Sequence, residues 1–441
     1  MEVAPLKRVA FYTLGCKTNQ YDTEAMQEQF QNENYAIVDF REIADFYIVN
    51  TCTVTSLSDK KSRQMIRRAH RNNPEAIIAV VGCYAQRAAQ DLLDIPGVSV
   101  VLGTNDRMRI VEHVEKSFRE KVPVNAVGDI MKVKDFEETP IGFHEGKTRA
   151  VLKIQEGCSQ YCSYCIIPYA RGPIRSRMPG DVLAEVERLT QNGFKEIVLT
   201  GIHIASYGKD LQGRVNLKDL LKEIHGIEGL ERIRLGSLEP TLLTKEFVSS
   251  TRGMPKLCRH YHISLQSGCN ATLQRMNRKY TTDQYRQIVD RLREAIPDVA
   301  ITTDIMSGFP GETREEFETT LSFVRAMDFS RIHVFKYSPR QGTPAADFAN
   351  QIPEQVKEDR SRQLIELGHR MEKSYLEHFI GKTENVLIEK MSLDKEGYCE
   401  GYTDHYIRVL TPSDGAIVNS LLPVNLKSIS GNYIRGSVAR S

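Results

Sequence analysis

Three cysteines at C-x₃-C-x₂-C spacing constrain this chain more than any other feature of its sequence: Cys158, Cys162 and Cys165. Three thiolates so spaced can hold three irons of a four-iron cluster, and the fourth iron is then open to a small chelating ligand. A structural zinc site needs four protein ligands, and neither a His nor another Cys follows at close range. The spacing therefore favours a reactive iron–sulfur centre, with a zinc knot as the alternative. We call these residues the CxxxCxxC triad.

The composition is that of a soluble globular protein with several domains. A chain of 441 residues is too long for one ordinary core and predicts two to four domains. The longest apolar runs, such as Ala76–Val81, are strand-sized, so we expect neither a signal peptide nor a spanning helix. We therefore expect a cytoplasmic protein without a membrane partner. In a reducing compartment, nine cysteines indicate metal ligands and buried thiols more than a disulfide framework.

Between Arg8 and about Arg119, strand-like runs alternate with helix-like stretches, as in an open α/β sheet. The expected pairs are Val9–Leu14 with Thr23–Gln31, Phe46–Val49 with Lys60–Arg71, Ala76–Val81 with Gln86–Leu93, and Val98–Leu102 with Asp106–Phe118. A cysteine follows each of the first three strands: Cys16, Cys52 and Cys83, here called the strand-end triad. Because parallel strands end at one edge of a sheet, these thiols could converge. The alternative is three unrelated buried cysteines.

The segment from about Arg149 to Pro339 repeats strand then helix about six times and predicts an incomplete (β/α)6 barrel. The expected strands are Ala150–Gln155, Glu196–Thr200, Arg232–Leu235, His260–Leu265, Val299–Met306 and Arg331–Lys336. Chemistry in such barrels lies at the C-terminal ends of the strands. Besides the CxxxCxxC triad, the residues at these ends are Gly201, His203, Ser237, Glu239, Gln266, Ser267, Asp304, Ser307, Tyr337 and Arg340.

A connecting helix over Glu354–Phe379 and a small five-stranded β-barrel are expected at the C-terminal end. The expected strands are Thr383–Glu389, Tyr398–Gly401, Tyr406–Leu410, Leu426–Ser430 and Tyr433–Ala439. Small barrels of this kind often bind nucleic acid, but seven Lys/Arg face seven Asp/Glu from Lys382 to Ser441. The net charge of the chain is only +2, so nucleic-acid binding would depend on local basic patches.

The whole chain resembles the methylthiotransferases of the radical S-adenosylmethionine (SAM) superfamily. The resemblance rests on the six cysteines in order and on Tyr164, the aromatic residue before the last cysteine of the CxxxCxxC triad. It implies an α/β protein with an N-terminal open α/β methylthiotransferase domain over 1–135, a radical SAM barrel over 144–375, and a TRAM-like RNA-binding barrel over 376–441. Around Cys16, the sequence Leu-Gly-Cys-Lys-Thr-Asn resembles the branch that acts on threonylcarbamoyladenosine in tRNA.

The resemblance implies two [4Fe-4S] clusters and SAM as cofactors. The CxxxCxxC triad would hold the SAM-cleaving cluster, and the strand-end triad would hold an auxiliary cluster that presents sulfur to the substrate. The radical made from SAM would remove hydrogen from C2 of the adenine, an aromatic C–H that ordinary acid–base residues cannot activate. The implied partners are tRNA and an electron donor of the flavodoxin or ferredoxin kind.

Several other residues are candidates for cofactor or RNA contacts. Tyr164, Ser237, Glu239, Gln266 and Arg177 are candidates for cofactor binding, with Glu239 as the best candidate because a carboxylate can accept from ribose or ammonium groups. Arg171, Arg175 and Arg177 could each hold the SAM carboxylate or an RNA phosphate, or could pair with acids. The basic helix at Lys60–Arg71 is by default a solvated face, with phosphate contact as the functional alternative. Cys258, Cys269 and Cys399 match no ligand pattern and are interpreted as ordinary thiols.

Two further functions stay open at this stage. The first is methylthiolation of another substrate, either isopentenyladenosine in tRNA or a ribosomal-protein aspartate. The second is a metal-stabilised RNA-binding protein without catalysis. Brown anaerobic protein containing about eight irons would support the enzyme, and a colourless zinc protein would support the binding module.

Overall fold

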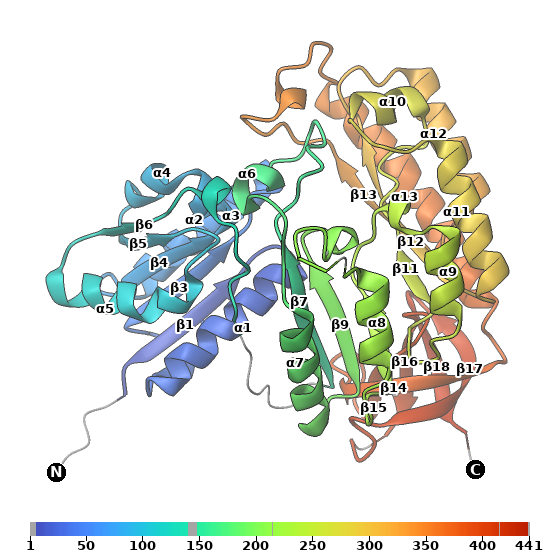
Figure 1. Ribbon diagram of the computed structural model, residues 1–441, viewed down its shortest axis with the longest axis horizontal. Helices are drawn as coiled ribbons and strands as arrows, with labels where there is room; N and C mark the ends of the chain where they lie inside the picture. The colour runs from blue at the N-terminus through green and yellow to red at the C-terminus, as the bar shows by residue number, and fades with distance from the viewer. Residues whose placement is uncertain (1–5, 140–147, 214, 414, 440–441) are drawn as a thin grey trace. The chain divides into compact units, whose positions relative to one another are not determined.

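The computed structural model describes residues 6–139, 148–213, 215–413 and 415–439 (Figure 1). The chain divides into two compact units. Unit 1 comprises Met1–Gly142, Lys153–Arg177 and Ser338–Ala346; unit 2 comprises Phe143–Leu152, Met178–Tyr337 and Asp347–Ser441. The loop that carries the CxxxCxxC triad therefore belongs to the same unit as the strand-end triad. The domain boundaries expected from the sequence stay predictions, and the expected barrel start at residue 144 lies outside the described residues.

Unit 1 is built on a parallel sheet with the strand order β2-β1-β3-β4-β5-β6. The strands are β1 (Arg8–Thr13), β2 (Ala36–Val38), β3 (Phe46–Thr51), β4 (Ile77–Gly82), β5 (Val98–Leu102) and β6 (Val124–Ala126). The helices are α1 (Lys17–Asn32), α2 (Ser56–Asn72), α3 (Cys83–Arg87), α4 (Ala89–Leu93) and α5 (Ile110–Glu120). The expected open α/β sheet is confirmed, with β2 and β6 as short edge strands that the sequence pattern did not reveal.

Both faces of this sheet are covered, which explains why its central strands β3 and β4 are mostly apolar. On one face, Met65 and Ile66 of α2 and Leu92 of α4 pack against alternate residues of β3 and β4. On the other, Phe30 of α1 and Val114 of α5 pack against the intervening residues. The predicted helix Gln86–Leu93 is interrupted at Ala88, whose backbone is not helical (φ −141°, ψ 47°).

The barrel strands begin with β7 (Arg149–Glu156), which spans the boundary between the two units. Strands β10-β9-β7-β8 form one hydrogen-bonded set and β11-β12-β13 form a second. The bridge between Leu238 and Ile263 links the two sets. The remaining bounds are β8 (Arg175–Ser176), β9 (Glu196–Gly201), β10 (Arg232–Leu235), β11 (His260–His262), β12 (Ala300–Ser307) and β13 (Arg331–Lys336). The predicted incomplete barrel is confirmed, although β11 is shorter than expected.

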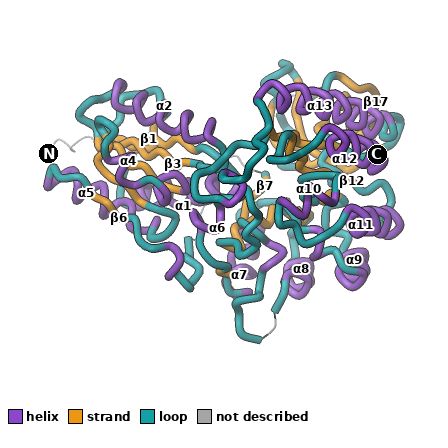
Figure 2. Tube along the Cα trace, turned by 90° about the horizontal axis from the view of Figure 1, so that it is seen from above, coloured by secondary structure: helices purple, strands orange, loops and turns teal. Residues whose placement is uncertain are grey.

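Helices cover the outer side of these strands within unit 2. Seen from above, they follow one another in an arc from α7 through α8, α9, α11 and α12 to α13 (Figure 2). Capping boxes at Thr281 and Thr313 fix where α11 and α12 begin. The helices are α6 (Ile167–Arg171, in unit 1), α7 (Pro179–Gln191), α8 (Leu217–His225), α9 (Lys245–Arg252), α10 (Asn270–Arg275), α11 (Thr282–Ala295), α12 (Arg314–Met327) and α13 (Glu354–Glu377).

The C-terminal strands close into a barrel, which confirms the small five-stranded barrel expected from the sequence, and their order is β14-β15-β16-β18-β17. They are β14 (Thr383–Met391), β15 (Tyr398–Thr403), β16 (Arg408–Pro412), β17 (Leu421–Ser430) and β18 (Tyr433–Val438). Buried arginines attach this barrel to the rest of unit 2: Arg232 donates to the carbonyls of Tyr402 and Asn385, and Arg234 donates to that of Thr403. Among the described residues, no helix combines the length and apolar character needed to cross a membrane.

Candidate active site

The strand-end triad lies at one edge of the unit 1 sheet. Cys16 immediately precedes α1, Cys52 directly follows β3, and Cys83 is the first residue of α3 after β4. The strands β1, β3 and β4 are neighbours, so their C-terminal ends are adjacent. Cys16 is exposed, whereas Cys52 and Cys83 are buried. The convergence expected from the sequence is therefore present.

A glycine brings the Cys16 loop onto Cys52. Gly15 has a φ of +108°, and a Cβ placed there would lie 2.9 Å from Cβ and 3.2 Å from Sγ of Cys52. Any side chain at position 15 would occupy the space that Cys52 fills. Burial raises the pKa of the Cys83 thiol to about 12 and also raises the pKa of Cys52. Two buried thiols and one exposed thiol at a sheet edge fit a metal cluster, because metal binding supplies the charge that deprotonates such thiols.

The CxxxCxxC triad lies on the loop between β7 and α6. The backbone N–H of Cys158 donates to the Gly172 carbonyl at 3.0 Å and closes the base of this loop. Within it, Cys165 N–H donates to the Cys162 carbonyl at 2.9 Å. Ala345 N–H donates to the Ser163 carbonyl at 2.8 Å and holds the middle of the loop. Cys162 is buried, and the other two cysteines are half-buried. Three thiols on one pinned loop fit the three-ligand iron–sulfur arrangement.

Gly157 allows the close approach at the base of this loop. Its φ is +72°, and a Cβ at this position would lie 1.8 Å from the Pro173 carbonyl oxygen. Both features exclude larger residues without a movement of the backbone. The glycine that precedes Cys158 therefore determines the path by which the loop carrying the triad leaves β7.

A buried group of charged side chains lies beneath the cysteines of unit 1. Asp22 and Glu156 face three cations: Arg107, Lys153 and Arg171, all five at most 2% exposed. Asp22 lies 2.5 Å from Arg107 and 2.6 Å from Lys153, and Glu156 lies 2.8 Å from Arg171. Burial alone would raise the pKa of Asp22, but Arg107, Lys153 and Arg171 together hold that pKa below its ordinary value. We call these five residues the buried charge cluster.

Sequence reasoning did not identify the buried charge cluster. The signal available is the placement of Lys153 inside the buried strand β7 and of Glu156 at its end, because charged residues in a buried strand require partners. From the sequence, Arg171 is a candidate contact to the SAM carboxylate or to an RNA phosphate, with pairing to acids as the alternative. The structure supports the other alternative for Arg171, since this residue is fully buried and pairs with Asp22 and Glu156.

The predicted cofactor-binding residues fall in both units. In unit 1, Tyr164 is half-buried, and Arg177 is 3% exposed with its Nε donating to Glu138 at 2.8 Å. In unit 2, Glu239 is 7% exposed and accepts from Nη2 of Arg278 at 2.8 and 3.0 Å. Its nearest carboxylate oxygen lies 3.9 Å from His203, which also follows a barrel strand.

The two remaining candidates, Ser237 and Gln266, also lie in unit 2. Ser237 is exposed at the end of β10. Gln266 is half-buried and has a φ of +67°, and its backbone pairs with that of β12. The residues placed at the strand ends by sequence are thus found there, but their roles stay predictions.

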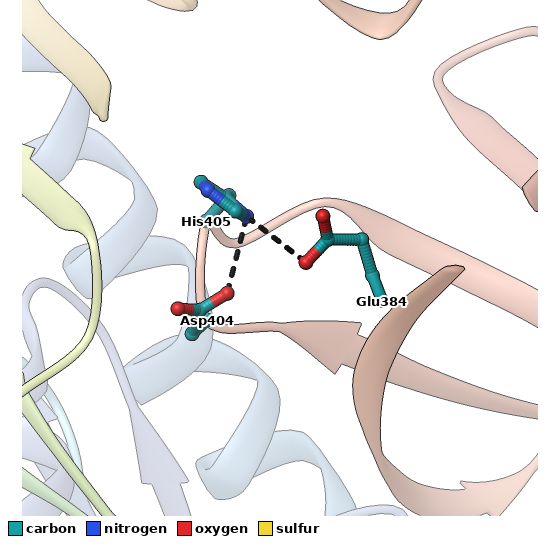
Figure 3. A group of neighbouring side chains, drawn as sticks. All are labelled: Glu384, Asp404 and His405. Atoms are coloured by element: carbon teal, nitrogen blue, oxygen red, sulfur yellow. Dashed lines mark ion pairs between the residues drawn. The ribbon is translucent and has the colours of Figure 1, made fainter. Parts of the chain in front are cut away.

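A second group of ligand-type side chains belongs to the C-terminal barrel. Glu384, Asp404 and His405 bring ligand atoms within 4.8 Å of one another (Figure 3). The guanidinium of Arg259 already bridges the two carboxylates, at 2.6 Å from Asp404 and 3.3 Å from Glu384. Each of the two carboxylates is thereby paired with the protein's own cation. This group is best explained as the ion-pair cluster that fixes the barrel to the start of β11.

Comparisons with known proteins agree with this geometry. Residues 8–103 match the family described as "Uncharacterized protein family UPF0004", and residues 152–324 match the Radical SAM superfamily. The threonylcarbamoyladenosine tRNA methylthiotransferase MtaB of Bacillus subtilis is 42% identical over 98% of this chain and 96% of its own length. The tRNA-2-methylthio-N(6)-dimethylallyladenosine synthase of Clostridium tetani is 35% identical over 89% of this chain and 87% of its own.

A solved structure shows the same fold at much lower identity. The radical SAM methyltransferase TsrM from Kitasatospora setae aligns with a TM-score of 0.58 and 16% identity, over 78% of this chain and 77% of that one. Taken with the near full-length relatives and the two sets of three cysteines, this chain belongs to the radical SAM methylthiotransferase family, in its threonylcarbamoyladenosine tRNA branch.

Proposed function

We propose that this chain converts N6-threonylcarbamoyladenosine beside the tRNA anticodon to its 2-methylthio derivative. Relatives named for activity on threonylcarbamoyladenosine tRNA, 37–42% identical over at least 91% of this chain, support this substrate. The synthases named for the dimethylallyl nucleoside are 35–36% identical. The sequence around Cys16 also resembles the branch that acts on threonylcarbamoyladenosine.

In this proposal each cysteine triad holds one [4Fe-4S] cluster. The CxxxCxxC triad holds the cluster that binds SAM, and the strand-end triad holds the auxiliary cluster. When bound, the two clusters and SAM supply the radical chemistry and the sulfur that substitution at an aromatic C–H requires. The single observation that carries the proposal is that both triads, each shaped by a glycine with positive φ, lie in one compact unit.

The protein's own residues would position the cofactor and exclude water. Tyr164, Ser237, Glu239, Gln266 and Arg177 are proposed to contact SAM. Glu239 is well suited, because its ion pair with Arg278 fixes the carboxylate at the C-terminal end of a barrel strand. For Arg177, a cofactor carboxylate would share the guanidinium with Glu138.

Contacts to tRNA are proposed for the exposed face of α2 and for the C-terminal barrel. Lys60, Lys61, Arg67 and Arg71 of α2 are exposed, and this helix begins just after Cys52. Cationic side chains on one helix face can contact successive phosphates. An electron donor of the flavodoxin or ferredoxin kind would reduce the SAM-binding cluster. A tRNA substrate also makes the cytoplasm the proposed location.

Nucleoside mass spectrometry of tRNA tests this function. A strain lacking the protein should lose 2-methylthio-threonylcarbamoyladenosine and regain it with the wild-type chain, but not with Cys52→Ala or Cys158→Ala. Cys399→Ala is the matched control, because Cys399 is buried in the C-terminal barrel away from either triad in sequence and should restore the product. Loss of a dimethylallyl-type nucleoside instead would refute the substrate, and full product from Cys52→Ala would refute the two-cluster assignment.

A further inference from the structure

Arg171 touches a thiol of the strand-end triad although it follows the CxxxCxxC triad in sequence. It is the last residue of α6, and α6 packs against α3, which begins at Cys83. The Nε of Arg171 donates to Sγ of Cys83 at 3.1 Å, and the side chain is fully buried. The segment carrying one triad thus supplies a hydrogen-bond donor to the other.

The remaining donors of the guanidinium fix its orientation. Nη1 donates to Glu156 at 2.8 Å and to Asp22 at 3.1 Å, and Nη2 donates to the side-chain carbonyl of Asn19. A planar guanidinium with these acceptors on two sides has its Nε–H direction determined. The hydrogen bond to Cys83 is therefore part of a preorganised arrangement.

Asn19 extends this arrangement to the other two cysteines of the strand-end triad. Its Nδ2 donates to the carbonyl of Leu14 at 2.7 Å and to that of Thr51 at 3.0 Å. Leu14 lies two residues before Cys16, and Thr51 immediately precedes Cys52. Arg171 thus contacts one cysteine directly and, through Asn19, the backbone beside the other two.

We infer that Arg171 is a positioning residue that donates a hydrogen bond to the Cys83 thiolate and raises the reduction potential of the cluster held by the strand-end triad. The inference rests on the proposed assignment of that triad to a cluster. Hydrogen bonds to cluster sulfurs are among the features that set such potentials, because they stabilise the more negative, reduced form. The segment after the SAM-binding loop would thereby tune the auxiliary cluster.

A redox titration of the auxiliary cluster alone tests this role. The full-length chain with Ala at all three cysteines of the CxxxCxxC triad is reconstituted anaerobically, and one-electron reduction at a mediated electrode is followed by electron paramagnetic resonance. Arg171→Lys keeps the charge that compensates Asp22 and Glu156 but lacks the Nε donor. It should make reduction less favourable by about tenfold, which equals about 59 mV for one electron.

Arg107→Lys is the matched control. Arg107 binds the same two acids, at 2.5 Å from Asp22 and 3.1 Å from Glu156, and its guanidinium also pairs with Glu137. It should change protein stability without changing the potential. Equal shifts in the two variants, or no shift in Arg171→Lys, would overturn the inference, because the contact with sulfur would then have no effect of its own.

A second measurement keeps Arg171 in place, so it tests the inference even if the Arg171→Lys protein does not assemble its cluster. In reduced protein labelled with ¹⁵N-arginine, pulsed electron paramagnetic resonance should detect a nitrogen coupling to the auxiliary cluster, and absence of this coupling would overturn the inference. Iron content distinguishes failure of the cluster assignment from failure of the role inferred for Arg171. Protein without iron in the strand-end triad would remove the cluster assignment and this inference with it, whereas bound iron with an unchanged potential would remove the inference alone.

Discussion

Replacing Gly157 by Ala should displace the loop that carries the CxxxCxxC triad. The new Cβ would lie 1.8 Å from the Pro173 carbonyl oxygen and 2.7 Å from that of Gly172, both of them backbone atoms that cannot rotate away. The φ of +72° adds about 1–2 kcal/mol of strain for a residue with a side chain. Relief of the clash would also break the 3.0 Å hydrogen bond from Cys158 to Gly172, which contributes about 0.5–1.5 kcal/mol.

These contributions amount to about 1.5–3.5 kcal/mol against the native loop, or roughly a ten- to four-hundredfold change in its population. We expect Gly157→Ala protein purified anaerobically to hold about four irons where the wild type holds about eight, and to have lost SAM cleavage. Gly128→Ala is the control, because Gly128 lies in the same unit and a Cβ there would meet no atom within 4 Å. Wild-type iron content and SAM cleavage in Gly157→Ala would show that the loop tolerates the displacement and that this reasoning is wrong.

Three further outcomes are expected. Replacing Lys60, Lys61 and Arg67 together by Gln should weaken tRNA binding and reduce the slope of log K for tRNA binding against log salt concentration by about one per lost phosphate contact. An unchanged slope would show that this helix face is only solvated. Glu239→Gln should weaken SAM binding by roughly 1.5–3 kcal/mol while iron content is unchanged, as measured by equilibrium dialysis, and wild-type affinity would make Glu239 structural. Burial alone would raise the pKa of Asp404, but its contact with His405 and its hydrogen bonds from Arg259 lower that pKa. This carboxylate therefore stabilises the fold above its unfolded pKa of about 3.9, and the contribution is lost as the pH falls through the lower folded pKa. The protection factors of the β14 and β16 amides against hydrogen exchange should therefore fall on acidification in the wild type and change less in Asp404→Asn; an equal fall in the two proteins would contradict this account.

Much of the fold and of the candidate site follows from local patterns in the sequence. Strands such as Arg232–Leu235 and Arg331–Lys336 have the bounds expected from their periodicity. The strand-end triad could be predicted because each of its cysteines directly follows a buried strand, and parallel strands end at one edge whatever helices connect them. The CxxxCxxC triad lies within eight residues of chain, so its proximity needs no tertiary information at all.

The role of Arg171 could be decided only by the tertiary structure. Its partner acids lie 149 and 15 residues away, at Asp22 and Glu156, and no local pattern distinguishes it from Arg177, which has a different partner. From the sequence alone, Arg171 could contact SAM, contact RNA or form an ion pair. Packing of α6 against α3 removed water from its guanidinium, and a buried charge must be paired, so the fold brought the acids and the Cys83 thiol to it.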